Sequence, residues 1–541
     1  MKYKESRTNQ IGYMIQQAKI IVVVGMYKNF QIRNIETKEV LFEGDIVGEK
    51  YDESSGDIVR YAVFTDFQTP GMYMFCLDGC EEGEKIIIGD GIYESVADQL
   101  LQVIYLQRCG CQISKEKYGI WGRVACHVKD AVLIGQGRMR ERNVVGGWHD
   151  AGDYGRYTVP TIATIKHILF TYELLETNLV SRWKGIDAFK NRLLEDVRYG
   201  MRWIEKMQDE SGGFYQKVTS AKYPGLDVLP EKDESTLYIC PVTTQATATA
   251  VAIAARVSFV FEKIDLEFSK QCWGMALKGW KFLEQNQESI YYKNPDMIET
   301  ESYITENDID CRFWAVCELY NATGEEKYSQ LIAEMLEKEK FDLCRFDWRL
   351  VGGWGTLAYL MTSQKKIPEI ENKLEKAILN QANALVEISK NNGYMISMVR
   401  EDYVWGSFMN LLNNGICLMT AGLLKGREEY HKWAQEHIHY IFGKNPLSIC
   451  YVTGMGENRI FHPHHRVCIA YPESEPIKGM VIGGPNVINQ DSVSAEKLKG
   501  CKPGKAYIDD VDCFSVNEMT TYWNTATLIL VVYYGNKRRE G

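Results

Sequence analysis

Acidic residues at two distant places in the chain carry the clearest chemical signal of the sequence. Asp150 and Asp153 lie in the segment Gly-Gly-Trp-His-Asp-Ala-Gly-Asp at positions 146 to 153, and Glu518 follows Asn517 near the C-terminus. The small residues between the two aspartates let the backbone turn tightly, so that both carboxylates can converge on one water molecule. Carboxylates this far apart in sequence face each other across a cleft only if the fold brings them together, which is the arrangement that glycosidic bond cleavage requires. We therefore expect a hydrolase that acts on sugars.

The composition is that of an ordinary globular protein and excludes several classes. A chain of 541 residues predicts at least two folding units. The net charge of −10, with both signs interspersed, argues against a nucleic-acid partner, which would need clustered Lys and Arg. No apolar run is long enough for a membrane span or an export signal, so we expect a cytoplasmic protein without a membrane partner. The fifteen cysteines are then expected as free thiols or metal ligands rather than as a disulfide set.

The chain shows two regions of different texture. From about residue 9 to residue 91, short apolar runs alternate with Gly, Asp and Pro turns, which predicts a small β-sandwich domain over residues 1–92. From about Glu94 the apolar period becomes helical, and about twelve helices are expected over residues 93–541. No fixed repeat recurs, which favours a closed barrel of paired helices over a repeat array. The predicted segments are strands at 20–24, 61–64 and 73–77, and helices at 94–108, 188–207, 244–262, 371–389 and 405–424.

The longest stretch without helical period runs from Pro446 to Asp512 and contains His462, His464 and His465. A compact domain rarely keeps so long an irregular segment unless that segment builds a site. We therefore expect functional residues in this stretch.

A second cluster of reactive side chains precedes the first acidic pair. Cys109, Cys126, His127 and His149 are two thiols and two imidazoles, ligand types that suit a closed tetrahedral zinc site with a structural role. Ordinary buried thiols are the alternative, and Cys111 competes for one ligand position. Because His149 directly precedes Asp150, a bound ion would position the acidic turn without entering the chemistry. Calcium stays open as a second ion, and no organic cofactor is expected.

The sequence around the acidic residues resembles glycoside hydrolase family 9, a family of inverting β-glucan hydrolases. An Asp-x-x-Asp pair alone more often caps a helix or lies in a solvated turn, so the surrounding motifs decide. One family signature is complete as Tyr507, Asp509, Phe514, Glu518, Thr520, Asn524 and Thr525. A second is nearly complete over positions 451 to 466, with Gly456, Asn458, Pro463, His464 and Arg466 on pattern and Cys450 as a departure just before it. The N-terminal segment Asn-Gln-Ile-Gly-Tyr, positions 9 to 13, looks like the immunoglobulin-like domain found in one branch of the family.

The resemblance implies a mainly α fold: an (α/α)6 barrel preceded by a small immunoglobulin-like β-sandwich. It implies that Glu518 is the general acid, Asp153 the general base and Asp150 a holder of the attacking water. The single-displacement mechanism needs about 6.5–9.5 Å between the acid and base carboxyls. Asp509 is expected in the catalytic group as a negative charge near Glu518, together with Asp512. Members with this N-terminal domain often hold zinc through residues that match the Cys and His cluster.

Substrate contacts are expected from the irregular segment and from aromatic rings. His464 and Arg466 would hydrogen-bond sugar hydroxyls, with a buried ion pair as the plainer role for Arg466. Trp148, Trp354, Tyr403 and Trp405 are candidate stacking platforms, among which we favour Trp354 and Trp405, although aromatic residues at helical spacing usually pack inside the core.

The substrate expected is a β-linked oligosaccharide, and the mode of cleavage is left open. The leading hypothesis is an exo-acting, β-glucosidase-like enzyme that trims short β-1,4-linked glucans (cellodextrins). Gln216 stands where the family usually has His, and Phe408 where it often has Asn, so substrate contacts differ from those of polymer-degrading members. Alternatives are an endo-β-1,4-glucanase, an exo-β-glucosaminidase in which an acid such as Glu457 meets the substrate ammonium, or a non-enzymatic oligosaccharide-binding protein. Whether the chain self-associates is also left open.

Overall fold

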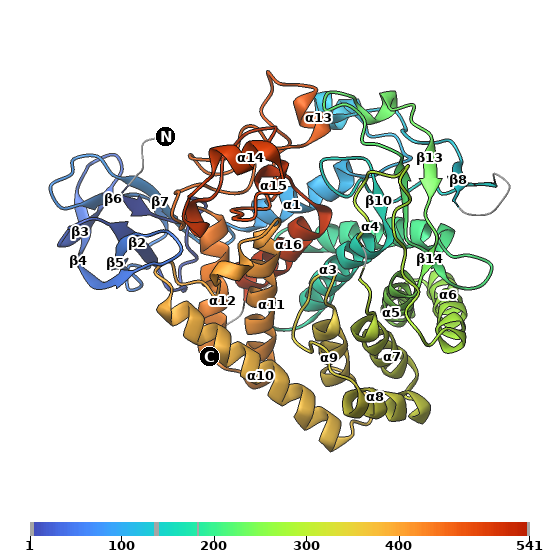
Figure 1. The fold of residues 1–541 in the computed structure, drawn as a ribbon. Helices are drawn as coiled ribbons and strands as arrows, with labels where there is room; N and C mark the ends of the chain where they lie inside the picture. The colour runs from blue at the N-terminus through green and yellow to red at the C-terminus, as the bar shows by residue number, and fades with distance from the viewer. Residues whose placement is uncertain (1–4, 135–139, 181–182, 304, 538–541) are drawn as a thin grey trace. The chain divides into compact units, whose positions relative to one another are not determined.

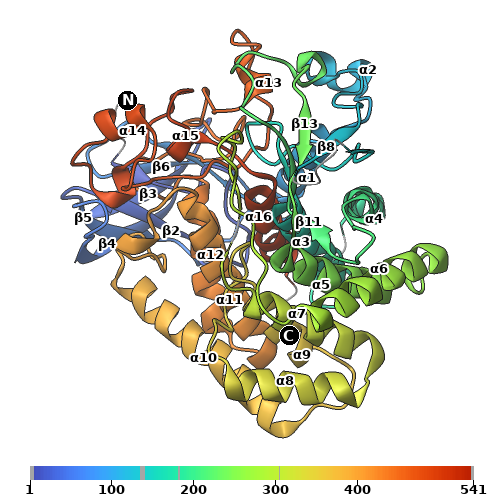
Figure 2. The ribbon, with the colours of Figure 1, turned by 45° about the vertical axis from the view of Figure 1, so that its right-hand side comes forward.

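The computed structural model describes residues 5–134, 140–180, 183–303 and 305–537, and Figures 1 and 2 draw it as a ribbon. The chain divides into two compact units. Unit 1 comprises Met1–Val103, Leu174–Ile186 and Ala382–Gly541, whereas unit 2 comprises Ile104–Glu173 and Asp187–Gln381. The predicted acid Glu518 therefore belongs to unit 1, and the Asp150–Asp153 turn and the Cys and His cluster belong to unit 2.

The N-terminal part of unit 1 is an all-antiparallel sheet of seven strands in the order β1-β2-β5-β4-β3-β6-β7 (Figure 1). Its interior is a single apolar cluster that includes Tyr13, Phe30, Phe64 and Phe75. The predicted strands at 20–24, 61–64 and 73–77 are confirmed within a few residues as β2, β5 and β6. The strands are β1 (Ser6–Arg7), β2 (Ile20–Val24), β3 (Asn29–Asn34), β4 (Val40–Tyr51), β5 (Ile58–Val63), β6 (Gly71–Leu77) and β7 (Glu84–Ile88).

Strand β4 is the one that continues from one half of this sheet to the other. It pairs with β3 through its first half and with β5 through its second half, with a register shift between Val47 and Lys50. Gly48 lies within that shift with φ of 69°, a left-handed conformation that a residue with a side chain adopts only under strain. The bulge therefore bends the sheet on itself, as a sandwich requires.

Helices dominate the rest of the chain. The described residues contain twelve helices that are at least nine residues long, which agrees with the number predicted from the sequence. Seven short strands between them were not predicted, because runs of two to four residues are too short to show a period of two. These strands are β8 (Ala131–Leu133), β9 (Glu141–Arg142), β10 (Arg156–Tyr157), β11 (Phe214–Tyr215), β12 (Lys217–Ser220), β13 (Leu237–Ile239) and β14 (Val242–Thr243). The twelve helices are α1 (Glu94–Leu106), α3 (Thr158–Glu176), α4 (Ile186–Lys206), α5 (Thr244–Phe261), α6 (Leu266–Gln285), α7 (Ile309–Thr323), α8 (Glu326–Lys338), α9 (Gly352–Leu360), α10 (Pro368–Asn391), α11 (Ser407–Lys425), α12 (Glu428–Ile441) and α16 (Thr521–Asn536).

In unit 1, α11, α12 and α16 pack together, and both ribbon views show α11 and α12 side by side. Gly415 of α11 permits close approach, because a Cβ there would lie 2.9 Å from a methyl carbon of Leu530 in α16. Helix α12 carries three buried histidines. His437 bonds to the Ser397 hydroxyl at 2.6 Å, and His439 bonds to the Asn9 side chain at 2.8 Å.

These buried histidines predict that the free energy of unfolding decreases at acidic pH. Burial lowers the pKa of His431 and His437 to about 4 and that of His439 to about 3, whereas the unfolded chain protonates histidine near a pKa of about 6.5. Their contribution to stability is therefore complete above pH 6.5 or so and is lost as the pH falls toward the folded values, by about 1.4 kcal/mol per histidine per pH unit. Urea unfolding between pH 7 and pH 5 measures this slope.

The variant His437→Gln is expected to give a slope shallower by about one proton. The control variant His462→Gln makes the same replacement at an exposed histidine. A His437→Gln slope equal to that of the wild type would contradict the prediction.

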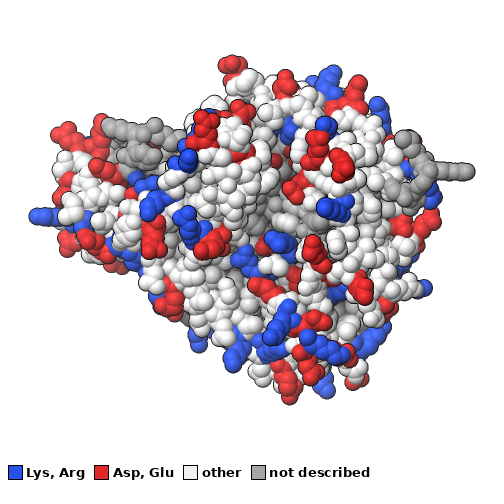
Figure 3. All heavy atoms as spheres, viewed as in Figure 1, with Lys and Arg blue, Asp and Glu red and all other residues white. Residues whose placement is uncertain are grey.

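In unit 2, α5 packs against both α6 and α7, and α7 packs against α9. Helices α5 and α11 are long and apolar enough to span a membrane by length and composition alone, but 83% of each such stretch is buried in the fold, as in a core helix. Lys and Arg intermingle with Asp and Glu over the face drawn in Figure 3. All fifteen cysteines lie among the described residues, and none of them forms a disulfide there.

Candidate active site

The turn that carries Asp150 and Asp153 is held by backbone bonds within unit 2. The His149 amide donates to Gln107 O at 2.9 Å, and the Gln107 side chain donates back to the carbonyls of His149 at 3.2 Å and Ala151 at 2.8 Å. The Asp150 amide closes the turn by donating to Gly155 O at 3.0 Å. The backbone of the acidic turn is therefore fixed on both sides.

Both carboxylates of the turn are buried, at 3% exposure for Asp150 and 7% for Asp153. Asp153 Oδ2 accepts the Gly155 amide at 2.8 Å and the Tyr157 hydroxyl at 3.4 Å. Burial, and then the charge of Asp153, raise the pKa of Asp150 well above its usual range. Among the described residues, Asp150 Oδ2 is buried without a hydrogen-bond partner. A buried oxygen in that state is suited to a small polar molecule such as water.

Tyr303 is a neighbour of this turn that no motif in the sequence indicated. Its hydroxyl hydrogen-bonds the Asp150 carboxylate, and its ring lies 4.7 Å from that of Tyr157. The Gln216 side chain donates to Tyr303 O at 2.6 Å and accepts the Thr243 hydroxyl at 2.7 Å. The amide that we expected to alter substrate contacts therefore holds the Tyr303 segment, a role that only the folded chain reveals.

Cys109, Cys126, His127 and His149 come together as the sequence predicts, with their ligand atoms within 4.8 Å of one another. Zn–S bonds of about 2.3 Å and Zn–N bonds of about 2.0 Å in a tetrahedron imply S···N separations of about 3.5 Å and N···N separations of about 3.3 Å. The corresponding S···N distances here are 3.6 Å for Cys109–His127 and 3.7 Å for Cys126–His149, and the N···N distance between His127 and His149 is 3.3 Å. The residues therefore fit a four-coordinate zinc ion, and the oxygen ligands that calcium prefers are not in this group.

The surroundings of the cluster support the same fit. His127 Nε2 lies 3.2 Å from Asp233 Oδ2, the carboxylate–imidazole contact that commonly orients a metal-bound histidine. Burial lowers the pKa of His149 to about 4, so its ring is neutral at pH 7 and its Nε2 is available as a ligand. Cys111, the predicted competitor, is outside the group.

Glu518 lies in unit 1 between α15 (Phe514–Asn517) and α16 and is 9% exposed. Its carbonyl accepts the Gly483 amide at 2.8 Å, and its backbone forms a parallel bridge with His464. Thr520 then caps α16 by accepting the Trp523 amide through its side chain. The backbone on both sides of Glu518 is thus fixed by the irregular segment and by a capped helix.

Asp509 binds backbone and side-chain groups of two neighbouring segments, and its expected charge effect on Glu518 stays a prediction. Its carboxylate accepts the amides of Phe461 at 2.8 Å and His462 at 2.9 Å, and the side chain of Asn517 at 3.2 Å. Asp509 therefore ties the loop before His464 to the residue before Glu518. Asp512, the second expected charge, is exposed.

The two polar residues predicted to contact substrate are both buried in unit 1. His464 Nδ1 lies 2.5 Å from Val511 O, a contact that requires the proton on Nδ1 and leaves Nε2 as an acceptor. Burial lowers the pKa of His464, so the ring is neutral. Arg466 begins the short helix α13 (Arg466–Ile469) and is 5% exposed.

The two favoured tryptophans lie in different surroundings. Trp405 is half-buried, and its ring lies 5.2 Å from that of Phe514, which lies 5.8 Å from His464. Trp354 is 1% exposed and donates through Nε1 to Phe346 O at 3.1 Å. Trp354 is therefore a core residue of unit 2, whereas Trp405 belongs to the aromatic group next to His464.

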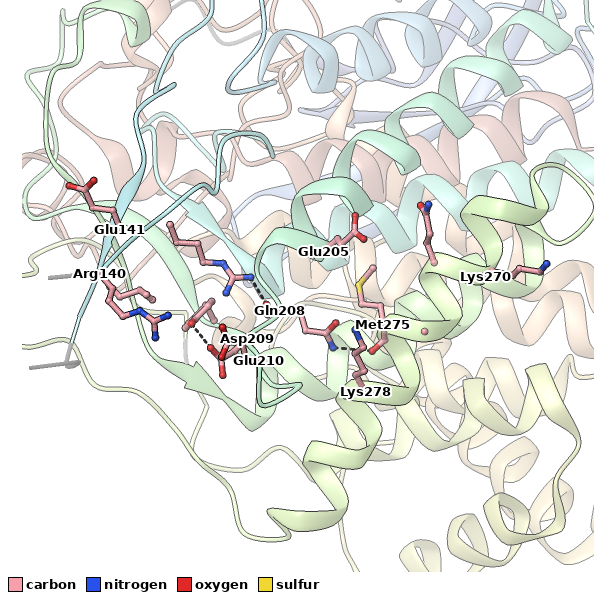
Figure 4. Close-up of a pocket in the computed structure, with 14 residues that line it drawn as sticks. Arg140, Glu141, Glu205, Gln208, Asp209, Glu210, Lys270, Met275 and Lys278 are labelled. Atoms are coloured by element: carbon pink, nitrogen blue, oxygen red, sulfur yellow. Dashed lines mark hydrogen bonds between the residues drawn. The ribbon is translucent and has the colours of Figure 1, made fainter. Parts of the chain in front are cut away.

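A separate cavity of about 890 Å³ opens in unit 2, and Figure 4 shows its lining. Arg142 donates to Gln208 O at 2.5 Å, and Gln208 Nε2 donates to Met275 O at 3.1 Å, so polar groups of the wall bond to one another. Side chains of both charge signs line it, and none of the predicted site residues is among them. This cavity is therefore distinct from the acidic turn.

Comparison with known proteins places these features in a family. The model of glycosyl hydrolase family 9 matches residues 93–531, and that of the cellulase N-terminal ig-like domain matches residues 3–82. A cellodextrinase of Butyrivibrio fibrisolvens is 30% identical over 541 residues, covering 96% of this chain and 98% of that protein.

Two solved structures extend the likeness to the fold. A single mutant of a thermostable endoglucanase from Alicyclobacillus acidocaldarius is 30% identical, with a TM-score of 0.90 over 98% of this chain and 99% of that one. A zinc-binding triple mutant of another family 9 endoglucanase is 26% identical, with a TM-score of 0.90 over 97% of this chain and 100% of that one. The predicted fold class, mainly α with an (α/α)6 barrel preceded by a β-sandwich, is confirmed. The chain is a glycosidase and belongs to glycosyl hydrolase family 9.

Proposed function

We propose that the chain hydrolyses β-1,4-linked glucan oligosaccharides with inversion at the anomeric carbon. The observation that carries the proposal is the buried Asp150–Asp153 turn, in which one carboxylate oxygen has no partner among the described residues and the backbone is fixed. Such a pair can hold a water molecule and take a proton from it. The name of the 30% identical cellodextrinase supports the substrate class.

In this proposal Asp153 is the general base, Asp150 helps to hold the water, and Glu518 is the general acid that protonates the departing oxygen. Tyr303 steadies Asp150 through its hydroxyl. His464 presents an acceptor nitrogen and Arg466 a charged donor to sugar hydroxyls.

Cleavage from a chain end is the mode that we propose, on short oligomers. Support comes from the cellodextrinase relative, which spans nearly the same length as this chain. Endo cleavage is the second candidate, favoured by the 30% identical endoglucanase structure.

Product analysis on cellotetraose and on a soluble β-glucan separates these modes. Release of α-configured glucose or cellobiose from the tetramer, with slow loss of polymer viscosity, supports the proposal. Rapid loss of viscosity with mid-chain products would replace it with endo cleavage. β-Configured products would contradict inversion, and no turnover of either substrate would leave only oligosaccharide binding.

We further propose that the Cys and His cluster holds one structural zinc ion, which supplies a rigid cross-link when bound. This chain's own residues then do two things: they join three separate segments, and they fix His149 next to Asp150. The separations of the ligand atoms and the Asp233 contact support the proposal.

Loss of one ligand is expected to remove the ion. Cys109→Ser should lower the zinc content, measured by elemental analysis, from about one ion per chain to near zero and lower the Tm by roughly 5–10 °C. Cys111→Ser is the matched control and should keep both values. Zinc retained in Cys109→Ser, or lost in Cys111→Ser, would show that the ligand set is different.

A further inference from the structure

We propose that Gln10, in the N-terminal immunoglobulin-like part of the chain, is a positioning residue for the general acid Glu518. The inference rests on the proposed function, because it takes Glu518 as that acid. All residues in the argument lie in unit 1. Gln10 touches no reacting group, so its effect must travel through the backbone that it binds.

The Gln10 side chain makes four hydrogen bonds to the irregular segment of the catalytic region. Its Nε2 donates to the carbonyls of Ser448 at 2.9 Å and Asn458 at 3.3 Å. Its Oε1 accepts the amides of Glu457 and Asn458, both at 2.9 Å. One carboxamide therefore closes the loop between residues 448 and 458 by bonding to both of its ends.

Two glycines shape the space around this carboxamide. A Cβ on Gly456 would lie 2.8 Å from Gln10 Oε1, and a Cβ on Gly443 would lie 2.7 Å from Gln10 Nε2. Both glycines have positive φ, at 74° and 126°. The backbone of Gln10 is anchored as well, since its amide donates to Phe442 O at 2.9 Å. The Gln10 side chain therefore packs tightly between Gly443 and Gly456.

The side chain of the adjacent residue, Asn9, is also held by hydrogen bonds. Its Nδ2 lies 2.7 Å from the Tyr93 hydroxyl and 2.8 Å from His439 Nδ1, while its Oδ1 accepts the Ile11 amide at 2.9 Å. Asn9 is fully buried. Because both neighbouring side chains are bonded, the position of the loop is tied to Tyr93, just before α1, and to α12 together.

From this loop, a ladder of backbone bridges leads to Glu518. Residues 450 and 459 are bridged, and the strand-like stretch 450–452 is bridged to 481. Ile482 is bridged to Met519, the residue after Glu518, and Gly483 donates to Glu518 O at 2.8 Å. Glu518 is bridged in turn to His464. Gln10 therefore closes one edge of a small layer whose other edge carries the acid and a predicted substrate contact.

A shift of this layer would displace the carboxyl that must protonate the leaving oxygen. Misplacement of a catalytic group by about 1 Å can lower a rate by roughly 100-fold. The loss should depend on the leaving group, because a good leaving group departs with little help from a general acid. A general weakening of the fold would not show that dependence.

The experiment compares two substrates in the full-length chain. Gln10→Met keeps the side-chain stem and removes the four hydrogen bonds. We expect its kcat to fall on the order of 10-fold to 100-fold on cellotetraose and to stay within about twofold on a dinitrophenyl β-cellobioside, with KM for both little changed. Gly456→Ala, which crowds the same carboxamide, should give the same selective loss.

Gln17→Ala is the matched control. Gln17 is also a half-buried glutamine of the N-terminal part, and it donates to the backbone carbonyl of Tyr534 at 2.7 Å, outside the layer. This variant should leave kcat on both substrates unchanged. The melting temperatures of all three variants show whether each chain is folded under assay conditions.

Two results would overturn the inference: equal losses on the two substrates in Gln10→Met, or no loss on either. Failure of the proposed function is read separately, from Glu518→Gln. If Glu518→Gln retains the wild-type rate on cellotetraose, Glu518 is not the general acid. If Glu518→Gln shows the selective loss and Gln10→Met does not, only the positioning role of Gln10 falls.

Discussion

Replacing Glu518 by glutamine is expected to lower kcat on cellotetraose by roughly 10²- to 10⁴-fold, because the amide cannot donate the proton that a sugar alkoxide needs as it departs. The shape of the side chain is kept, and the backbone bonds of Glu518 to Gly483 and His464 do not involve the carboxyl. Stopped assays with chromatographic detection of glucose and cellobiose measure the loss. On a dinitrophenyl β-cellobioside the loss should be far smaller.

Glu473→Gln serves as the control for this variant, since Glu473 is an exposed glutamate of the same unit. Its rates should equal those of the wild type on both substrates. If Glu518→Gln lost the same factor on the aryl glycoside as on cellotetraose, Glu518 would not be the general acid.

Replacing Asp153 by asparagine is expected to lower kcat by a comparable factor on both substrates, because activation of water does not depend on the leaving group. The bonds that Asp153 accepts from Gly155 and Tyr157 can be kept by the amide oxygen. The turn should therefore keep its conformation, so the decrease in kcat should reflect the loss of the general base.

Sodium azide provides a sharper readout for this variant. A small anion can attack the anomeric carbon from the face that the water uses, without needing a base, and an inverting site would then yield the α-glycosyl azide. NMR of the product from the aryl cellobioside identifies its anomer. A β-azide would point to a covalent intermediate, and unchanged hydrolysis without azide would remove Asp153 from the role of base.

The sequence was sufficient for the main elements and for the residues close together in its motifs. Helices such as α5 and α10 have long apolar periods, and the Cys and His cluster has an unusual concentration of ligand types. Roles that depend on contacts between distant segments were out of reach. The effect of the Asp509 charge on Glu518 stays a prediction, whereas the bonds from the amides of Phe461 and His462 to Asp509 are contacts that a motif cannot show.

The aromatic residues show the same limit. Trp354 and Trp405 have the same side chain and comparable motif contexts, yet one is enclosed in a helical core and the other lies half-buried next to Phe514. Tyr303 was missed because it lies in an irregular stretch, and its segment reaches the acidic turn through tertiary contacts such as the bond from Gln216 to its carbonyl and the ring contact with Tyr157. Tertiary packing, rather than local pattern, decides these cases.

The bonds between Gln10 and Asn458 also set an order of events during synthesis. Their partners are separated by 448 positions in the chain. At a translation rate of about 5–20 residues per second, Asn458 is synthesised roughly 20–90 s after Gln10. Closing so long a loop is among the slow steps of folding, because the chain loses conformational entropy before the new contact stabilises it. The nascent chain can therefore fold its N-terminal sheet early, but the layer around Glu518 is completed only after Met519 has left the ribosome.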